Sequence, residues 1–320
     1  MRLPGPIDLW IALRFGAFSA SRLPEDADLL VGWSGASLEA IEPAKRLGMK
    51  VVIERGSLHI DAQTEILRNE YDRWNLDWRA TDPRLIERER AEYEAADRIA
   101  VGSRASAHSF VERGIPPERL IVNPYGALPS PARPAPKRRE DNRPIRILFV
   151  GQVGLRKGVP VLLQAFAKIR GCAELHLIGP MEPGFEAVLR RLPREGVVFR
   201  GPMPGRALTA EYAGADLFCL PSLEEGFGMV ILEAMAAGCP VVASTATGLA
   251  DICARDPEAG LPVPPGDPEK LAAAFAELIE DADRRRRMAE RGLTAVSAGF
   301  SWADYGARAV EAYQGLLRRT

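Results

Sequence analysis

The sequence has few of the residues that build disulfide frameworks or metal sites. Its 320 residues include four cysteines and three histidines. The cysteines share no C-x-x-C spacing and the histidines lie far apart, which argues against a disulfide framework and against a zinc site. We therefore expect reduced thiols and a cytoplasmic protein.

The sequence also lacks long apolar runs and an excess of either charge. The N-terminal stretch MRLPGPIDLWIALRFGAF is interrupted by Asp8 and Arg14, which makes it a poor signal peptide and a poor membrane span. The formal net charge is −1, so no overall field favours nucleic acid as a partner. The arginine run from 284 to 287 could suggest anionic lipid, but such a run in a helix is usually a solvated face, so we give it no weight. A weak peripheral membrane association stays open.

What the sequence does contain is two stretches of β–α alternation around a proline-rich segment. Residues 129–144 read PSPARPAPKRREDNRP, which suits neither a helix nor a central strand, so they are predicted to be a linker. After it, short apolar runs alternate with helix-like stretches to about residue 300. Five of these runs are predicted strands: IRILFV (145–150), AELHLIG (173–179), GVVFRG (196–201), DLFCLPS (216–222) and CPVVAS (239–244). This pattern predicts a doubly wound parallel sheet.

The first half has the same pattern with only four predicted strands. They are DLLVGW (28–33), MKVVIERG (49–56), RIAVGS (98–103) and RLIVNP (119–124). Because a doubly wound sheet usually has about five or six strands, this half looks incomplete at its start. We expect an α/β protein with a first domain at 1–128, a second at 145–300 and a terminal helix at 301–320.

One candidate site is the loop GQVGLRKG, which runs from Gly151 to Gly158 after the first strand of the second domain. It is neither a G-x-G-x-x-G fingerprint nor a G-x-x-x-x-G-K-[ST] loop, so NAD and Walker-type ATP binding lose support. Its place at the carboxyl end of a strand favours a ligand, and Arg156 and Lys157 suit a phosphate. The alternative is a solvated basic turn.

A second candidate is PSLEEGFGMVILEAMAAGCPVVAS (221–244), in which Glu233 lies within an apolar, helix-like run. Burying a carboxylate without a partner costs several kcal/mol, roughly, so we expect Glu233 to be buried against a ligand. A sugar diol can donate to both carboxylate oxygens, while an ion pair with a core Arg or Lys is the alternative. Gly226 and Gly228 would let an anion approach the helix start, with Glu225 on the same side as Glu233. Glu225 could instead be a surface residue beside Glu224.

These residues carry a family resemblance. The run EGFGMVILEAMAAGCPVVAS, with Glu225 and Glu233 separated by seven residues, resembles the nucleotide-sugar signature of the retaining GT-B glycosyltransferases of family 4. Further blocks of the second domain are similar to that family in the same order: FVGQVGLRKGVPVLLQAF, VVFRGPMP, YAGADLFCLPS, TGLADI and PVPPGDPEKLAAA. The first domain matches more loosely, through KVVIERGSLHI and NPYGA. The resemblance implies two Rossmann-like domains facing across a cleft, with the terminal helix packing back on the first.

The resemblance also implies roles for single residues. Glu233 would hold the ribose hydroxyls and Glu225 the hydroxyls of the transferred sugar. Arg156 and Lys157 would bind the diphosphate. The remaining predicted donor contacts are Gly151, the backbone around Arg200 to Met203 at the base, and Gly226, Phe227 and Gly228. His59 is a candidate catalytic residue that would face the cleft, or else a surface or capping histidine. Relatives commonly have an arginine where Gln152 stands here, and Arg156 would supply that charge from another angle.

The implied function is retaining transfer of a sugar from a nucleotide-sugar to a hydroxyl of a glycan or lipid-linked acceptor. The Asp-x-Asp pairs that hold a divalent ion in other transferases occur only at 26–28 and 281–283, in polar stretches, so we expect neither metal nor cofactor. The opening strand and glycine-rich loop of relatives are absent, which indicates an upstream start or a shortened chain. A catalytically impaired nucleotide-sugar-binding protein, and an epimerase or phosphorylase on the same fold, are the alternatives. The sequence does not specify the nucleotide, the sugar or the acceptor.

Overall fold

The computed structural model describes residues 6–77, 81–127, 143–169 and 171–318. The chain divides into two compact units, one formed by Met1–Pro124 with Tyr305–Thr320 and the other by Tyr125–Asp304. Most of the predicted linker, residues 129–144, lies outside the described residues.

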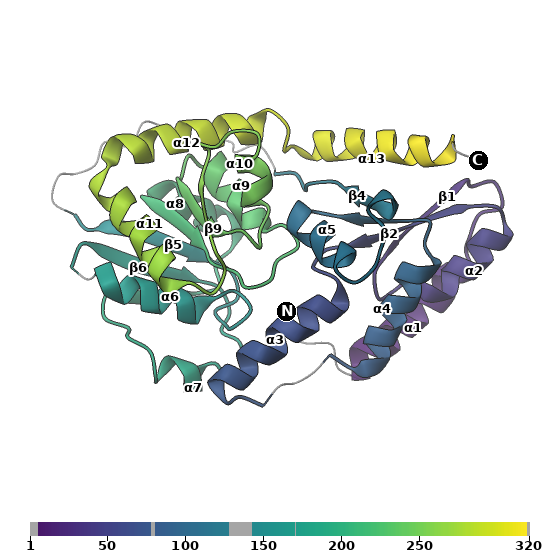
Figure 1. Ribbon diagram of the computed structural model, residues 1–320, viewed down its shortest axis with the longest axis horizontal. Helices are drawn as coiled ribbons and strands as arrows, with labels where there is room; N and C mark the ends of the chain where they lie inside the picture. The colour runs from purple at the N-terminus through teal and green to yellow at the C-terminus, as the bar shows by residue number, and fades with distance from the viewer. Residues whose placement is uncertain (1–5, 78–80, 128–142, 170, 319–320) are drawn as a thin grey trace. The chain divides into compact units, whose positions relative to one another are not determined.

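The first unit is built on a parallel sheet of four strands in the order β1-β2-β3-β4 (Figure 1). The strands are β1 (Leu29–Trp33), β2 (Lys50–Arg55), β3 (Arg98–Val101) and β4 (Leu120–Val122). The helices of this unit are α1 (Pro6–Ala20), α2 (Leu38–Arg46), α3 (Ile60–Trp74), α4 (Pro83–Ala95), α5 (Arg104–Val111) and most of α13 (Trp302–Leu317). All four strands predicted for this half are confirmed.

Alternation along the strands gives this sheet two apolar faces. Val51 and Ile53 of β2 lie in one cluster with residues of α2, α4 and α5. Val52, between them, lies on the opposite face in a cluster with Ala100 and with Leu316 of α13. The hydroxyls of Tyr305 and Tyr313 on α13 also donate to Glu54, at 2.7 and 3.1 Å. The terminal helix therefore covers a face of the first sheet.

Helix α1 leaves an apolar surface uncovered. Leu9 and Ala12 are buried with Leu85 of α4. Four large side chains elsewhere on the helix are more than half exposed: Trp10, Ile11, Phe15 and Phe18. Arg14 and Arg22 place their guanidinium groups over the rings of Trp10 and Phe18, respectively.

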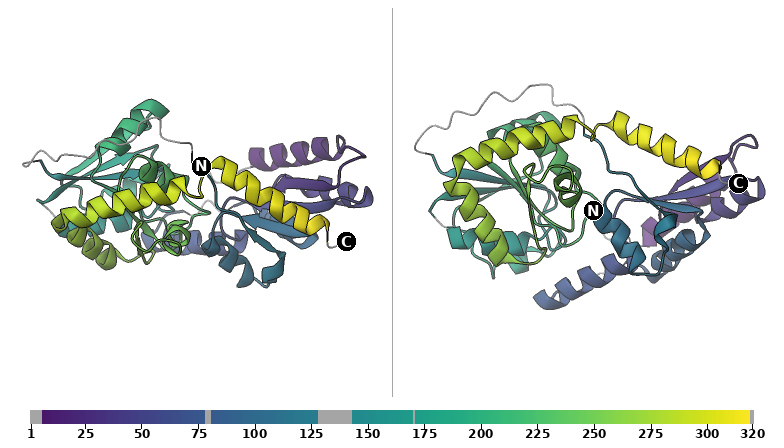
Figure 2. Two further views of the ribbon diagram at one scale, coloured as in Figure 1. Left: turned by 90° about the horizontal axis from the view of Figure 1, so that it is seen from above. Right: turned by 45° about the horizontal axis from the view of Figure 1, so that its top comes forward.

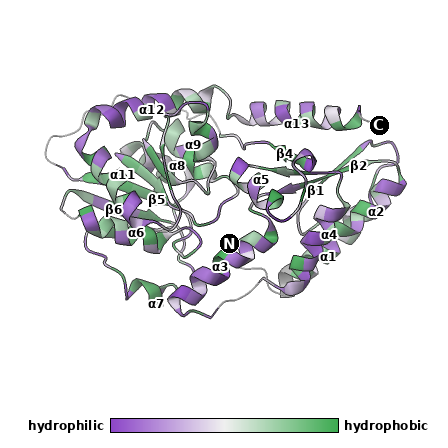
Figure 3. Ribbon diagram, in the orientation of Figure 1, coloured by the Kyte–Doolittle hydropathy of each residue, from purple (hydrophilic) through white to green (hydrophobic). Residues whose placement is uncertain are grey.

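The second unit contains a parallel sheet of six strands in the order β10-β9-β8-β5-β6-β7, and Figure 2 shows helices on either side of it. The strands are β5 (Ile145–Val150), β6 (Ala173–Ile178), β7 (Val197–Gly201), β8 (Leu217–Leu220), β9 (Val241–Ser244) and β10 (Leu261–Val263). The helices are α6 (Val159–Phe166), α7 (Glu186–Leu189), α8 (Gly205–Gly214), α9 (Met229–Ala236), α10 (Leu249–Cys253), α11 (Pro268–Glu280) and α12 (Ala282–Ser297). In Figure 3 the central strands and α9 are coloured hydrophobic, while α12 is largely hydrophilic.

The predicted doubly wound sheet is confirmed, with one strand more than expected. Strands β8 and β9 are buried at every position, as continuous apolar runs predict for a central parallel strand. Strand β10 was not predicted because it has three residues and contains Pro262, and proline is tolerated there since β10 lies at the edge of the sheet.

The arginine run at 284–287 lies on α12 and is largely committed to protein contacts. Arg284 pairs with Glu277, and Arg286 pairs with Asp283 at 2.9 Å. Arg285 is buried and donates to the carbonyl oxygens of Leu278 and Ile279. The run therefore gives little support to a lipid site. None of the helices in the described part of the chain is both long and apolar enough to span a membrane.

Candidate functional site

The order of strands in the second unit brings two predicted loops together. Strand β5 pairs with β6 on one side and with β8 on the other, so the chain leaves the carboxyl ends of β5 and β8 in opposite directions. Such a reversal of strand order opens a crevice where α/β sheets bind ligands. The loops that begin there are residues 151–158, after β5, and residues 221–228, after β8.

The two loops are packed backbone against backbone. The N–H of Leu223 donates to the carbonyl oxygen of Arg156 at 3.0 Å. Gly158 has a φ of +68°, and a Cβ at this position would lie 2.0 Å from the carbonyl oxygen of Pro221. Only glycine meets both requirements, so Gly158 fixes the approach of the loops and the position of the two cations before it.

The loops meet in a cluster of four charged side chains. Lys157 forms an ion pair with Glu225. Arg156 lies 3.2 Å from a carboxylate oxygen of Glu224 and 3.8 Å from one of Glu225. Ser222 lies 3.5 Å from the same oxygen of Glu225. Both cations predicted to hold a diphosphate are therefore balanced by carboxylates, and the alternative of a solvated basic turn is wrong.

Burial and mutual attraction oppose each other in this cluster. Burial lowers the pKa of Lys157 below its usual value, and Glu225 offsets only part of that effect. Burial alone would raise the pKa of Glu225, but Lys157 and Arg156 outweigh it, so the pKa of this carboxyl lies below its usual value. Glu225 is thus ionised, and it leaves Lys157 readily only if another anion takes its place.

Glu233 is exposed, which corrects the expectation that it is buried. Its neighbours on α9, Ile231, Leu232, Ala234 and Met235, are the residues that point into the core. Glu233 accepts a hydrogen bond from the hydroxyl of Tyr212 at 2.9 Å and has no ion pair within the described residues. The alternative prediction, that Glu233 pairs with a cation of the core, is therefore wrong. Such a pair is formed by Glu225 instead, with Lys157 and Arg156.

Helical spacing does not relate Glu225 to Glu233, and their placement on one side stays a prediction. Helix α9 begins at Met229, so Glu225 lies in the preceding loop and not on a helical turn. Gly228, with a φ of +86°, is the residue that caps α9. Phe227 is buried beside Phe300, and its side chain belongs to the core.

The predicted base contacts lie at the end of β7. Arg200 is exposed and pairs with Glu211 of α8 at 2.7 Å, and Met203 is half-buried in the segment that follows. Gly151 lies at the other end of the predicted site, where a Cβ would come within 3.7 Å of the Lys157 side chain.

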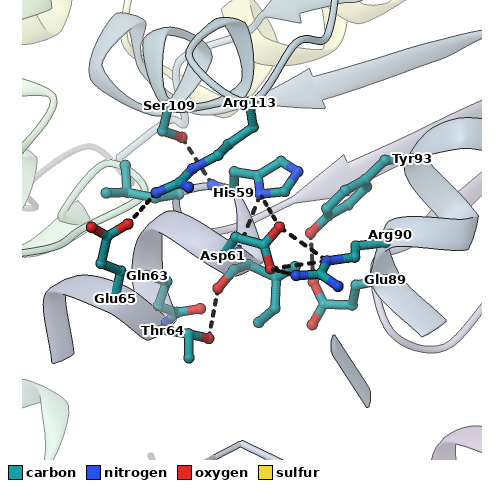
Figure 4. A network of polar contacts seen from close by, with 12 residues as sticks. His59, Asp61, Gln63, Thr64, Glu65, Glu89, Arg90, Tyr93, Ser109 and Arg113 are labelled. Carbon is teal, nitrogen blue, oxygen red and sulfur yellow. Dashed lines mark hydrogen bonds and ion pairs between the residues drawn. The ribbon is translucent and has the colours of Figure 1, made fainter. Parts of the chain in front are cut away.

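His59 is buried in the first unit and serves as the N-cap of α3 (Figure 4). Its Nδ1 accepts a hydrogen bond from the N–H of Asp61 at 3.2 Å, which requires an unprotonated nitrogen. Its ring packs against those of Tyr93 and Phe110. Burial lowers the pKa of His59 to about 4. These contacts favour the capping alternative over the catalytic one, and the ring is buried and not at the surface.

Two residues of this site were not predicted. Tyr212 carries no motif signal beyond its place in YAGADLFCLPS, and its contact with Glu233 joins positions 21 residues apart. Glu224 was not assigned a role, yet it is fully buried and pairs with Arg156, and Glu225 is buried as well, so the alternative that Glu225 is a surface residue is wrong. In the described residues no group of three or more His, Cys, Asp or Glu side chains is arranged to hold a metal ion.

Comparison with known proteins assigns the second unit to a family. Residues 144–281 match the model of the family described as glycosyl transferases group 1. A D-inositol 3-phosphate glycosyltransferase from Corynebacterium kroppenstedtii is 34% identical over 247 residues, which cover 70% of this chain and 54% of that protein. The chain spans about half the length of the curated relatives it matches.

Solved structures share the fold across nearly the whole chain. A sucrose-phosphate synthase from Thermosynechococcus elongatus matches with a TM-score of 0.73 and 24% identity, over 97% of this chain and 79% of that one. The Anabaena protein HepE, solved with UDP-glucose, matches with a TM-score of 0.68 and 19% identity, over 95% of this chain and 82% of that one. The predicted GT-B fold class is confirmed by these similarities.

Proposed function

Residues 144–281 form a domain of the glycosyl transferases group 1 family, and from this we propose that the protein transfers a sugar from a nucleotide-sugar to a hydroxyl of a glycan or lipid-linked acceptor. The proposal includes retention at the transferred carbon, a cytoplasmic location and no need for a metal. The observation that carries it is the cluster of Arg156, Lys157, Glu224 and Glu225 where the two loops meet at the reversal of strand order.

The cluster is suited to exchange one anion for another. A donor diphosphate takes the place of the Glu225 carboxylate beside Lys157 and Arg156. Glu225 is then available to accept hydrogen bonds from hydroxyls of the sugar, while Glu224 continues to orient Arg156. Binding of the diphosphate and recognition of the sugar are thereby coupled in one step.

The same cations stabilise the transition state. The bond from the sugar carbon to the diphosphate oxygen breaks as the bond to the acceptor oxygen forms on the same face. The acceptor proton passes to the departing phosphate oxygen. Negative charge therefore grows on the diphosphate, where Lys157 and Arg156 are fixed by their loop in advance. The fixed charge of the chain's own residues supplies the stabilisation.

The test is a panel of nucleotide-sugars, screened by thermal shift and then by product analysis with Lys157→Ala beside the wild type. A ligand bound only by the folded state raises the melting temperature. We expect one donor to do so, and Lys157→Ala to slow its transfer by about 100-fold to 1,000-fold, as for removal of one preorganised charge. Lys168→Ala, which removes an exposed pair with Glu269, is the matched control and should leave transfer unchanged.

The other outcomes decide between the alternatives. Donor binding without any transfer would favour an impaired binding protein, turnover without acceptor an epimerase, and a requirement for free phosphate a phosphorylase. Equal transfer by the wild type and Lys157→Ala would contradict the proposed mechanism. Weak membrane association is proposed only with a lipid-linked acceptor and is supported by the exposed apolar surface of α1. Co-sedimentation with anionic vesicles, absent if the acceptor is water-soluble, distinguishes the two acceptor classes.

A further inference from the structure

Glu233 is held by a single residue of a neighbouring helix. The hydroxyl of Tyr212 on α8 donates to Oε2 of Glu233 on α9 at 2.9 Å. In the part of the chain that the structure describes, Glu233 makes no second side-chain hydrogen bond. Its other oxygen, Oε1, is therefore left for a ligand.

Tyr212 is fixed far more firmly than the carboxylate it contacts. Its side chain is almost fully buried, and its ring lies 5.7 Å from that of Phe218 on β8. Burial, with a smaller contribution from Glu233, raises the pKa of the Tyr212 phenol far above its usual value. The phenol therefore keeps its proton at physiological pH, and in the structure it donates this proton to Glu233 in a hydrogen bond.

Helix α8 also organises the neighbouring part of the predicted nucleotide site. Glu211, directly before Tyr212, pairs with Arg200 at 2.7 Å and lies 3.8 Å from Arg146. Consecutive residues of one helix thus contact Glu233, expected at the ribose, and the side chain of Arg200, whose backbone is expected at the base. This arrangement indicates that α8 positions residues for the nucleoside as well as packing on the sheet.

We propose that Tyr212 is a positioning residue that holds Glu233 in the orientation needed to accept hydrogen bonds from both hydroxyls of the donor ribose. The preference for ribonucleotides over 2′-deoxyribonucleotides then depends on Tyr212. This inference rests on the proposed function, because it assumes that Glu233 binds the ribose.

The physical reason is that Tyr212 restricts the side-chain rotamers of Glu233 before the ligand binds. An exposed glutamate samples several rotamers, and a ligand that needs one of them must overcome the entropy of the others. The Tyr212 hydrogen bond selects one rotamer before binding and occupies only one acceptor position of Oε2. Oε1 and the rest of Oε2 can then meet two neighbouring hydroxyls. A donor without the 2′-hydroxyl gains little from this arrangement.

The test compares binding of UDP and 2′-deoxy-UDP by calorimetry in the wild type and in Tyr212→Phe. We expect UDP to bind about 10-fold more weakly to Tyr212→Phe, as for the loss of a hydrogen bond to a charged group. Binding of 2′-deoxy-UDP should change by less than about twofold, so that the ratio of the two affinities falls. If the donor panel shows that the protein binds GDP or ADP, the comparison uses that nucleotide and its 2′-deoxy form.

Tyr305→Phe is a matched control because its hydroxyl also donates to a carboxylate, Glu54, at 2.7 Å in the first unit. It should leave the affinity ratio unchanged. Because the phenylalanine ring keeps its packing, the melting temperature of Tyr212→Phe should stay close to that of the wild type. An equal loss of affinity for both nucleotides in Tyr212→Phe would overturn the inference, since a merely structural role predicts that result.

Glu233→Ala separates the inference from its premise. If Glu233→Ala lowers the affinity ratio and Tyr212→Phe does not, the positioning role of Tyr212 fails and the donor site stands. If Glu233→Ala leaves the ratio unchanged while the wild type still binds a nucleoside diphosphate, Glu233 does not read the ribose and the inference fails, whereas the proposed function stands. If no nucleoside diphosphate binds the wild type, the proposed function itself fails. If both variants lower the ratio and the double variant lowers it no further, the two residues act as one unit and the inference is supported.

Discussion

The carboxyl ends of the two sheets carry similar residues with different consequences. In the second unit, Lys157 and Arg156 meet Glu225 and Glu224 where two loops diverge. In the first unit, Arg55 meets Glu89 at 2.7 Å near the ends of β1 and β2. Both groups are buried ion pairs, so burial and charge alone do not distinguish a structural network from a binding site.

The difference lies in how each carboxylate is satisfied. Glu89 accepts hydrogen bonds from Ser34 and Tyr93 in addition to the Arg55 pair. The guanidinium of Arg55 also donates to the Leu58 carbonyl and to Gln63. All of these partners belong to the first unit. Glu225, in contrast, has two cations beside it and only a distant contact with Ser222, which is why we propose that an incoming anion replaces it. A fully satisfied network stabilises the fold, whereas a network held mainly by charge can exchange partners.

The largest expected effect is on stability, from Glu89→Ala in the first unit. The variant removes the Glu89 carboxylate that pairs with Arg55 and that accepts hydrogen bonds from the hydroxyls of Ser34 and Tyr93. Breaking a buried pair from one side costs about 3–5 kcal/mol in the free energy of unfolding, which urea denaturation measures. Glu89→Gln keeps an acceptor oxygen and should lose less. Because the network is structural, nucleotide affinity measured on the folded variant should match the wild type, and a changed affinity would break the comparison.

The next effect is a pH dependence that arises from His59. The pKa of His59 in the folded protein is about 4 because of burial, opposed by Asp61 and reinforced by Arg113, Arg55 and Arg90. Since this value is below the unfolded value of about 6.5, the stabilisation is present above pH 6.5 and is lost as the pH falls toward 4. We expect the wild type to lose about 2 kcal/mol of unfolding free energy between pH 7.5 and pH 5 from this residue alone.

His59→Asn tests that origin because asparagine caps a helix without titrating in this range. Urea denaturation at the two pH values should show a smaller difference in the variant than in the wild type. An equal difference in both would assign the acid sensitivity to other groups and leave His59 open as a ligand-facing residue.

Much of the fold could be predicted from local sequence, and most of the site's pairing could not. Runs such as IRILFV and DLFCLPS predict buried strands because side chains on both faces of a central parallel strand are apolar. The pairing of Lys157 with Glu225 joins positions 68 residues apart and depends on strand order, which no local pattern specifies.

The error at Glu233 has a more specific cause. In a helix that is apolar at nearly every position, the sequence does not reveal which side faces the core, since the usual contrast between faces is missing. Helix α9 has only eight residues, and Glu233 lies on its one outward side. Glu233 is still the proposed ribose contact, but the cost of burying a carboxylate cannot be the reason because its side chain is exposed. The reason is now its hydrogen bond with the buried Tyr212.

The smallest expected effect is also the sharpest test of the comparison, because it predicts a gain. Glu225→Ala removes the carboxylate that we propose competes with a diphosphate for Lys157. UDP should therefore bind more tightly to the variant than to the wild type, by roughly 10-fold for one nearby charge at a partly buried site. Transfer should nevertheless fall, since Glu225 is also the proposed contact to the sugar. Calorimetry with UDP measures the affinity, and product formation measures the rate of transfer.

Added UDP should also raise the melting temperature of Glu225→Ala by more than it raises that of the wild type, whereas Glu89→Ala should show no such extra increase. Weaker UDP binding by Glu225→Ala would mean that Glu225 orients Lys157 and Arg156 and does not compete with the ligand for them. The Glu225 cluster would then be a structural network like that of Glu89.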